Sequence, residues 1–505
     1  MASLNILLDE LIEETGGLGR FQIMLIGVIL GSKVAFTWSM LIMSFAGVAP
    51  KWWCTDRDAG NGSYYFNGTH DHHNNSADFM NCSASVSGCG SFRFDTSLST
   101  VVSEWTLVCD ESWIPSTVTT IQMAGVFIGG LLSGHISDAI GRKPTYFASI
   151  AILGLSNFVA YFSVSWQMFA VVRFVIGLGC GGFVCVYFIF ASEYVDNKWR
   201  SLLAAIPSWT LYAALLALVA WLVPHWKYLH LATALSAIPF MFTWWIVPES
   251  FRLLATQGRW EEAQLIVRKV AKWNKKPDPN EEKLTAIAEL ITSNQTKKSN
   301  KNHYTIRHLF ATNTLIKNTA LNFIIWLSCG YGYYAITFGV KDLSGNLFVN
   351  MFLISAIEIP SSALIIYLNN RIGRRWTCIL FFAVASACGI GVAVVQYIES
   401  GSIAMVVLAL IAKLGVGSGW VATMVLTSET YPTVIRSIGF SFQLTVSRIG
   451  SMVAPQVVFG AEHIPGLMYF IFGVMMAMST VCLFLLPETH GKVTLDEIHD
   501  KLTKK

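Results

Sequence analysis

The sequence predicts an all-α membrane protein of twelve transmembrane helices, arranged as two six-helix pseudo-repeats, with a cysteine-rich extracellular loop domain. Three observations predict it: the composition, the spacing of the apolar segments and a charged motif that occurs twice. Of 505 residues, 53% are hydrophobic and 13% are charged, whereas soluble domains carry about 25% charged residues. The net charge of +4 is small, so we expect the lipid bilayer and no nucleic acid as a partner.

The apolar segments have the length of membrane spans, because a spanning helix needs about 20 mainly apolar residues. The N-terminal segment 1–17 carries acidic side chains and lacks the basic region of a signal peptide. We therefore expect the first span to remain in the mature chain. The twelve predicted spans are 21–46, 117–140, 145–164, 168–190, 203–223, 227–247, 314–339, 347–368, 377–397, 403–427, 437–459 and 466–486.

The short connections differ in charge between the two sides. Those on one side carry basic residues, while 398–402 and 460–465 on the other side contain no Lys or Arg. The positive-inside rule therefore places both termini of this multi-pass chain in the cytoplasm, with the plasma membrane as the expected location. The predicted divisions are a cytoplasmic N-terminus (1–20), a first half (21–247), a cytoplasmic loop (248–313), a second half (314–486) and a cytoplasmic tail (487–505).

Two long segments interrupt the spans. Residues 48–116 are predicted to form an extracellular domain that is glycosylated and stapled by disulfides. Its glycosylation sequons lie at Asn61, Asn67, Asn74 and Asn81, and its cysteines are Cys54, Cys82, Cys89 and Cys109, whose three possible pairings stay open. The cytoplasmic loop is rich in charged residues and should contain amphipathic helices such as RWEEAQLIVRKVAKW, residues 259–273.

A charged motif and two companions recur almost half a chain apart. DAIGRKP at 138–144 matches NRIGRRW at 370–376, SEYVDNKWRS at 192–201 matches SETYPTVIRS at 428–437, and PESF at 248–251 matches PETH at 487–490. Three landmarks in the same order indicate a duplicated six-helix unit, which is typical of transporters built from parallel repeats.

These motifs resemble the major facilitator superfamily over essentially the whole chain. Within it, GRFQ at 19–22, SEWTLVC at 103–109, PESFRLL at 248–254 and SGNLFVNMFLISAIEIP at 344–360 resemble the organic cation, anion and zwitterion (carnitine) transporter family of solute carriers. The resemblance implies transport by alternating access, with a midplane substrate site between the halves.

The charges at the cytoplasmic ends of the helices are predicted to form gating networks that break when that side opens. The alternative is that the arginines only set the topology. The predicted gating residues are Asp138, Arg142, Glu193, Arg200, Arg371, Arg374, Glu429 and Arg436.

Ionisable residues deep in a membrane are functional candidates because burying each one is costly. Four stand out: Lys33, Glu358, Lys413 and Arg448. Arg448 falls where the resemblance puts an arginine in anion and carnitine-type members and an aspartate in cation members, and Lys413 also resembles the former. A structural role for Arg448, paired with Glu358 or with backbone carbonyls, stays open. Tyr333, Tyr334 and Trp209 complete the predicted substrate-binding residues as aromatic walls.

Two further polar residues in the first half are expected to lie outside the substrate site. Arg173 is expected either to reach the outer surface or to serve packing, and His230 is expected at the membrane interface.

The leading hypothesis is a polyspecific carrier of small organic anions or zwitterions, with an organic cation carrier of the same family as the alternative. A coupling ion or counter-substrate is left open. A sugar carrier is disfavoured because neutral polyols need no midplane charges, and a receptor because it needs no duplicated gating motif. No nucleotide loop, metal-ligand cluster or nucleophile–base spacing appears in the sequence, so no enzyme activity, cofactor or metal is expected.

Overall fold

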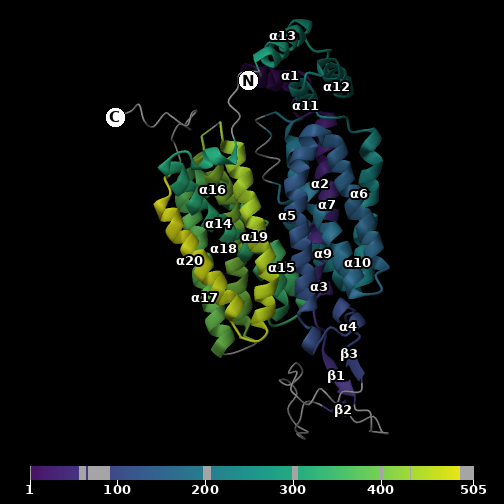
Figure 1. The fold of residues 1–505 in the computed structure, drawn as a ribbon, viewed down its shortest axis with the longest axis vertical. Helices are drawn as coiled ribbons and strands as arrows, with labels where there is room; N and C mark the ends of the chain where they lie inside the picture. The colour runs from purple at the N-terminus through teal and green to yellow at the C-terminus, as the bar shows by residue number, and fades with distance from the viewer. Residues whose placement is uncertain are drawn as a thin grey trace.

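The computed structural model describes residues 2–55, 64–65, 91–196, 199, 206–297, 305–398, 402–432 and 434–489. Most of these residues are helical (Figure 1). The first half of the chain contains α1 (Ala2–Glu14), α2 (Arg20–Leu41), α3 (Met43–Ala46), β1 (Trp52–Thr55), β2 (Tyr64–Tyr65), β3 (Ser91–Phe94), α4 (Val101–Trp105), α5 (Ile114–Ala139), α6 (Arg142–Tyr161), α7 (Trp166–Ser192), α9 (Ser208–Leu222) and α10 (Trp226–Met241). The remainder contains α11 (Phe251–Gln257), α12 (Trp260–Trp273), α13 (Glu281–Lys297), α14 (Asn313–Phe338), α15 (Leu347–Ala356), α16 (Ser361–Arg371), α17 (Arg374–Ile398), α18 (Ile403–Thr430), α19 (Arg436–Ala461) and α20 (Leu467–Leu485). Short 3₁₀ helices cover Cys109–Glu111, Phe242–Trp245, Ile306–Phe310 and Gly339–Asp342.

The long helices form two groups that lie side by side (Figure 1). In the first group α5 and α6 pack against α7, and α2 packs against α9 and α10. In the second group α14 packs against α19 and α20, and α17 against α18 and α20. The two groups meet along two seams, α5 against α19 and α9 against α15.

Seven stretches of the described residues are long and apolar enough to cross a membrane. They are Arg20–Ala46, Cys109–Ala139, Trp166–Ser192, Asn313–Asp342, Arg374–Ile398, Ile403–Thr430 and Leu467–Leu485, and α9 and α15 are shorter apolar helices. The chain is therefore a mostly helical, multi-pass membrane protein.

Several predicted spans are interrupted in the structure. The predicted helix 347–368 is wrong as one continuous helix, because α15 ends at Ala356 and α16 begins at Ser361. Pro360 stands at the N-cap of α16, and a proline lacks the N–H that would continue the helix from the preceding turn. Glu358 lies in this break. The predicted helix 227–247 likewise ends early, with α10 giving way to a 3₁₀ turn three residues after Pro239.

The two ends of the molecule carry different small structures (Figure 1). At one end, β2, β1 and β3 form an antiparallel sheet in that order. At the other end lie α1 and α11–α13, where Arg252 pairs with Asp9 and Lys283 pairs with Glu14. The amphipathic helix predicted at 259–273 is confirmed as α12, which buries Trp260, Ala263, Val267, Val270 and Ala271 along one side.

Candidate functional site

Four of the predicted substrate-binding residues meet between the two groups of helices. The Glu358 carboxylate lies 3.4 Å from the Lys413 ammonium of α18. Tyr333 of α14 donates its hydroxyl to Glu358 Oε2 at 3.2 Å, and Trp209 of α9 donates its indole N–H to the Tyr333 hydroxyl at 2.7 Å. We call Glu358, Lys413, Tyr333 and Trp209 the central cluster, which links the first half of the chain to the second.

The central cluster is closely packed, and the Lys413 ammonium has several hydrogen-bond and ion-pair partners in and around it. The Lys413 ammonium donates to the Tyr333 carbonyl at 3.2 Å and to the Thr337 hydroxyl at 2.8 Å, and it lies 3.1 Å from the centroid of the Tyr333 ring. Only 2% of the Lys413 side chain and 8% of the Glu358 side chain are exposed. The cavity among these side chains is about 10 Å³, which is room for about one water molecule. A larger ligand has to separate the pair.

Arg448, Tyr334 and Lys33 lie outside the central cluster. Arg448 of α19 is half-buried and hydrogen-bonds to the side chain of Tyr334. Lys33 of α2 donates to the Ser208 hydroxyl at 3.1 Å and lies 5.0 Å from the centroid of the Tyr187 ring.

The charges of Arg448 and Lys33 are not balanced locally. The alternative in which Arg448 pairs with Glu358 is wrong for this structure, because Glu358 pairs with Lys413. Among the described residues, no carboxylate lies within ion-pair distance of Arg448 or Lys33.

Two polar side chains of the first half are covered by neighbouring helices. His230 is fully buried and contacts the Asn157 amide oxygen through Nδ1 at 2.8 Å, so its ring packs between helices; its position at the membrane interface stays a prediction. Arg173 is also fully buried and donates to the Gln122 side chain. Of the two expectations for Arg173, the structure therefore supports the packing role and not the position at the outer surface. Arg173 Nε and Nη1 and His230 Nε2 are buried without a hydrogen-bond partner among the described residues.

Of the predicted gating residues of the first half, Asp138, Arg142 and Glu193 form one network at the corner between α5 and α6. Arg142 lies 2.7 Å from Asp138 and 3.3 Å from Glu193. The backbone N–H groups of Arg142 and Lys143 donate to the Glu249 carboxylate at 2.9 and 3.2 Å. Burial raises the pKa of the Glu193 carboxyl, while its hydrogen bond to Ser250 and the Arg142 charge oppose that rise.

The second half repeats this arrangement at the corner between α16 and α17. Arg374 lies 3.3 Å from Glu429, and the N–H groups of Arg374 and Arg375 donate to the Glu488 carboxylate at 3.1 and 3.2 Å. Glu249 and Glu488 were absent from the predicted gating set, although the PES and PET motifs that contain them are the sequence signal for this contact.

A glycine makes each corner possible. Gly141 and Gly373 have φ values of +128° and +97°, which residues with a Cβ rarely adopt. A Cβ on Gly141 would lie 2.3 Å from Glu249 Oε2, and one on Gly373 would lie 2.9 Å from Glu488 Oε2.

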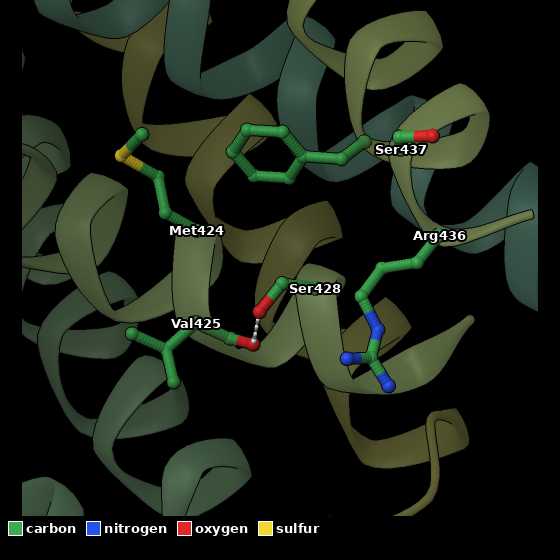
Figure 2. Close-up of a pocket in the computed structure, with 6 residues that line it drawn as sticks. Met424, Val425, Ser428, Arg436 and Ser437 are labelled. Atoms are coloured by element: carbon green, nitrogen blue, oxygen red, sulfur yellow. Dashed lines mark hydrogen bonds between the residues drawn. The ribbon is translucent and has the colours of Figure 1, made fainter. Parts of the chain in front are cut away.

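Two predicted gating residues stand apart from these networks. Arg371 is exposed and lies 5.7 Å from the centroid of the Tyr367 ring. Arg436 begins α19 and lines a pocket between α18 and α19 (Figure 2). Among the described residues Arg436 and Glu429 form no ion pair; Glu429 instead pairs with Arg374 and accepts a hydrogen bond from Thr489.

Some predicted residues lie outside the described part of the chain. These are Arg200, Asn61, Asn67, Asn74, Asn81, Cys82 and Cys89, together with the side chain of Cys54. Cys109 is disulfide-bonded, whereas Cys180, Cys185, Cys329, Cys378, Cys388 and Cys482 are free thiols. Within the described residues, no group of three or more His, Cys, Asp or Glu side chains is placed to hold a metal ion.

Comparison with solved structures gives the fold. The inward-open xylose transporter XylE from E. coli superimposes with a TM-score of 0.67 at 15% sequence identity, covering 94% of this chain and 98% of that chain. A partially occluded inward-open form of XylE gives a TM-score of 0.68 over 94% and 99% of the two chains, also at 15% identity. The described helices therefore adopt the transporter fold of the major facilitator superfamily.

Comparison with known sequences gives the family. The family described as "Sugar (and other) transporter" matches residues 64–502. Solute carrier family 22 member 21 of Mus musculus is 30% identical over 417 residues, 81% of this chain and 72% of that protein. The organic cation/carnitine transporter 2 of Rattus norvegicus is 30% identical over 82% of this chain and 74% of that protein. The organic cation transporter protein of Drosophila melanogaster is also 30% identical, over 82% and 76%. The matched families are membrane transporters and not enzymes, and the chain belongs to solute carrier family 22 of the major facilitator superfamily.

Proposed function

We propose that this protein carries small organic anions or zwitterions, carnitine-like compounds among them, across the plasma membrane by alternating access. The balance of charge between the helix groups carries the proposal. Glu358 neutralises Lys413, whereas neither Arg448 nor Lys33 has a carboxylate partner among the described residues. An interior with this excess of positive charge attracts a carboxylate and repels a simple cation.

Each predicted substrate-binding residue has a role in this proposal. The guanidinium of Arg448 offers two parallel N–H donors to a carboxylate, and Tyr334 holds that guanidinium in place. Lys33 adds positive charge in the first half. The ammonium of a zwitterion would be held by Glu358 or by the faces of Tyr333 and Trp209, with Lys413 releasing Glu358 as the ligand enters. Three relatives are named organic cation/carnitine transporter 2, which fits a zwitterion.

The same proposal includes the topology. Twelve spans form two pseudo-repeats with the divisions 1–20, 21–247, 248–313, 314–486 and 487–505, and both termini are cytoplasmic. The 48–116 loop is extracellular, which fits the position of β1–β3 at the end of the molecule opposite α11–α13 (Figure 1). Its sequons are glycosylated, and the disulfide of Cys109 joins it to another of the loop cysteines. The corner networks around Arg142 and Arg374 are the gates.

Uptake of three labelled compounds by cells expressing the protein tests this proposal: an aromatic carboxylate, carnitine and a quaternary ammonium. We expect uptake of the first two, and Arg448→Asp should shift the preference toward the ammonium compound. Lys272→Gln, which removes an exposed positive charge in α12, is the matched control and should leave the preference unchanged. Robust uptake of the quaternary ammonium alone would support the organic cation alternative instead. Repeating the assay with sodium and pH varied identifies any coupling ion.

A further inference from the structure

The pocket between the cytoplasmic ends of α18 and α19 is lined by an incompletely hydrogen-bonded guanidinium group and by apolar side chains. Its volume is about 480 Å³, and its lining residues are Met424, Val425, Ser428, Arg436, Ser437 and Phe440 (Figure 2). Two guanidinium nitrogens of Arg436, Nε and Nη2, are buried and have no hydrogen-bond partner among the described residues.

The acid that the sequence offers to Arg436 is already occupied. Glu429 lies 3.3 Å from Arg374 and accepts a hydrogen bond from Thr489 at 2.6 Å. A buried donor without an acceptor is destabilising, and more so when it is charged. An anion that reaches Arg436 therefore removes this cost as well as forming new charge-assisted hydrogen bonds.

The rest of the pocket suits the apolar part of an organic anion. Met424, Val425 and Phe440 supply the apolar surface (Figure 2). The Ser428 hydroxyl donates to the Val425 carbonyl at 2.8 Å, whereas the Ser437 residue is exposed beside Arg436. One strong anion-binding group next to an apolar wall matches a ligand with a carboxylate on an aromatic or alkyl body.

A continuous row of aromatic rings connects this pocket to the central cluster. Ring centroids lie 6.1 Å apart between Phe440 and Trp326, 5.5 Å between Trp326 and Trp420, and 5.8 Å between Trp420 and Tyr333. Tyr333 in turn contacts Lys413 and Glu358. Movement of one ring is thus transmitted along packed neighbours to the central cluster, since close-packed interiors transmit displacement.

We propose that the Arg436 pocket is a second, cytoplasm-facing binding site for the transported organic anion, where Arg436 holds the carboxylate and Phe440 contacts the apolar body. The proposal rests on the proposed function, because it takes the same class of substrate. The site holds the ligand on the cytoplasmic side before it enters, or after it leaves, the central cluster. Arg436 is then a specificity residue for one side of the membrane only.

Sided transport assays test this site. Purified protein is reconstituted into liposomes, and transport of labelled indole-3-acetate is measured separately for molecules exposing the cytoplasmic and the extracellular side. Arg436→Gln should raise the KM for cytoplasmic indole-3-acetate about tenfold and leave the extracellular KM unchanged. Arg436→Lys, which keeps the charge, should recover part of the affinity. Arg307→Gln, an exposed arginine at the same end, is the matched control and should change neither KM.

The outcomes separate the possible errors. If wild-type protein transports no indole-3-acetate from either side, the proposed function fails before the pocket is tested. If it transports indole-3-acetate but Arg436→Gln changes kcat equally in both directions with both KM values intact, Arg436 only gates and the pocket proposal is wrong. If phosphatidylglycerol protects the purified wild type, but not Arg436→Gln, against heat while indole-3-acetate protects neither, the pocket holds a lipid headgroup and the proposal is also wrong. Should Arg436→Gln fold poorly, the same heat-protection comparison is made with Arg436→Lys, where a weaker protection by indole-3-acetate than in wild type is expected.

Discussion

Removing one partner of the Glu358–Lys413 pair should be among the most damaging neutralisations in this protein. At the observed separation of 3.4 Å, two unit charges attract each other by about 5 kcal/mol at an effective dielectric constant of about 20. Solvent screening is weak because both side chains are buried. Breaking such a pair by removing one partner typically costs about 3–5 kcal/mol, since the other charge is left uncompensated. An unfolding entropy of about 2.1 cal/mol/K per residue then predicts that Lys413→Gln lowers the apparent melting temperature in detergent by about 3–5 °C.

A double-mutant cycle isolates the pair from the general effect of mutation. Lys413→Gln combined with Glu358→Gln removes both charges, so the double variant should melt above the Lys413→Gln and the Glu358→Gln single variants. The control is Arg268→Gln, which breaks the exposed ion pair between Arg268 and Glu281 at 2.6 Å. Exposed pairs contribute little to stability, so this variant should melt like the wild type.

The measurement is tryptophan fluorescence during heating, made on all four variants and the wild type in one detergent. If Lys413→Gln melts with the wild type, or if the double variant loses the sum of the two single losses, the ion pair does not stabilise the second half. The interpretation that the buried Glu358–Lys413 pair holds the central cluster together would then be wrong.

Three further predictions concern other parts of the molecule. Gly141→Ala should lower the apparent melting temperature, because its Cβ would lie 2.3 Å from the Glu249 carboxylate, whereas Gly134→Ala, with nothing within 4 Å of the new Cβ, should not; equal melting of the two variants would contradict the crowding argument. Trp209→Phe removes the 2.7 Å hydrogen bond to Tyr333 and should raise the substrate KM several-fold, since such a bond contributes about 1 kcal/mol; an unchanged KM would place Trp209 outside the path. Glycosidase treatment should increase the gel mobility of the wild type but not of a variant with Asn61, Asn67, Asn74 and Asn81 all changed to Gln. Asn294 begins the sequon NQT in the predicted cytoplasmic loop and should carry no glycan. A remaining mobility shift that Asn294→Gln removes would therefore overturn the topology.

The duplicated corners could be predicted from the sequence because their contacts are local to a motif. Gly141 and Gly373 stand immediately before the arginines that they position, and each acid lies at the end of a neighbouring helix. The spacing of apolar segments likewise predicted the helical, multi-pass fold, because every backbone group in a bilayer must be bonded within its own helix.

The central cluster could be predicted only in its members. Burial cost identified Glu358 and Lys413 as candidates, but their pairing depends on the break before Pro360, which directs Glu358 out of a regular helix. Sequence also could not show that His230 and Arg173 are covered. Their partners, Asn157 and Gln122, come from other helices, and a polar residue near a helix end has the same pattern whether it faces lipid headgroups or a neighbour.

The contacts of Glu249 and Glu488 have a mechanical consequence. Each of these residues follows the last membrane helix of its own half and accepts hydrogen bonds from backbone N–H groups at the start of the third membrane helix. Each contact therefore lies entirely within one half. Unlike the Arg142 and Arg374 side-chain pairs proposed as gates, these backbone contacts need not break when the halves tilt against each other. Each half can therefore move as a stiff body on the seams α5–α19 and α9–α15.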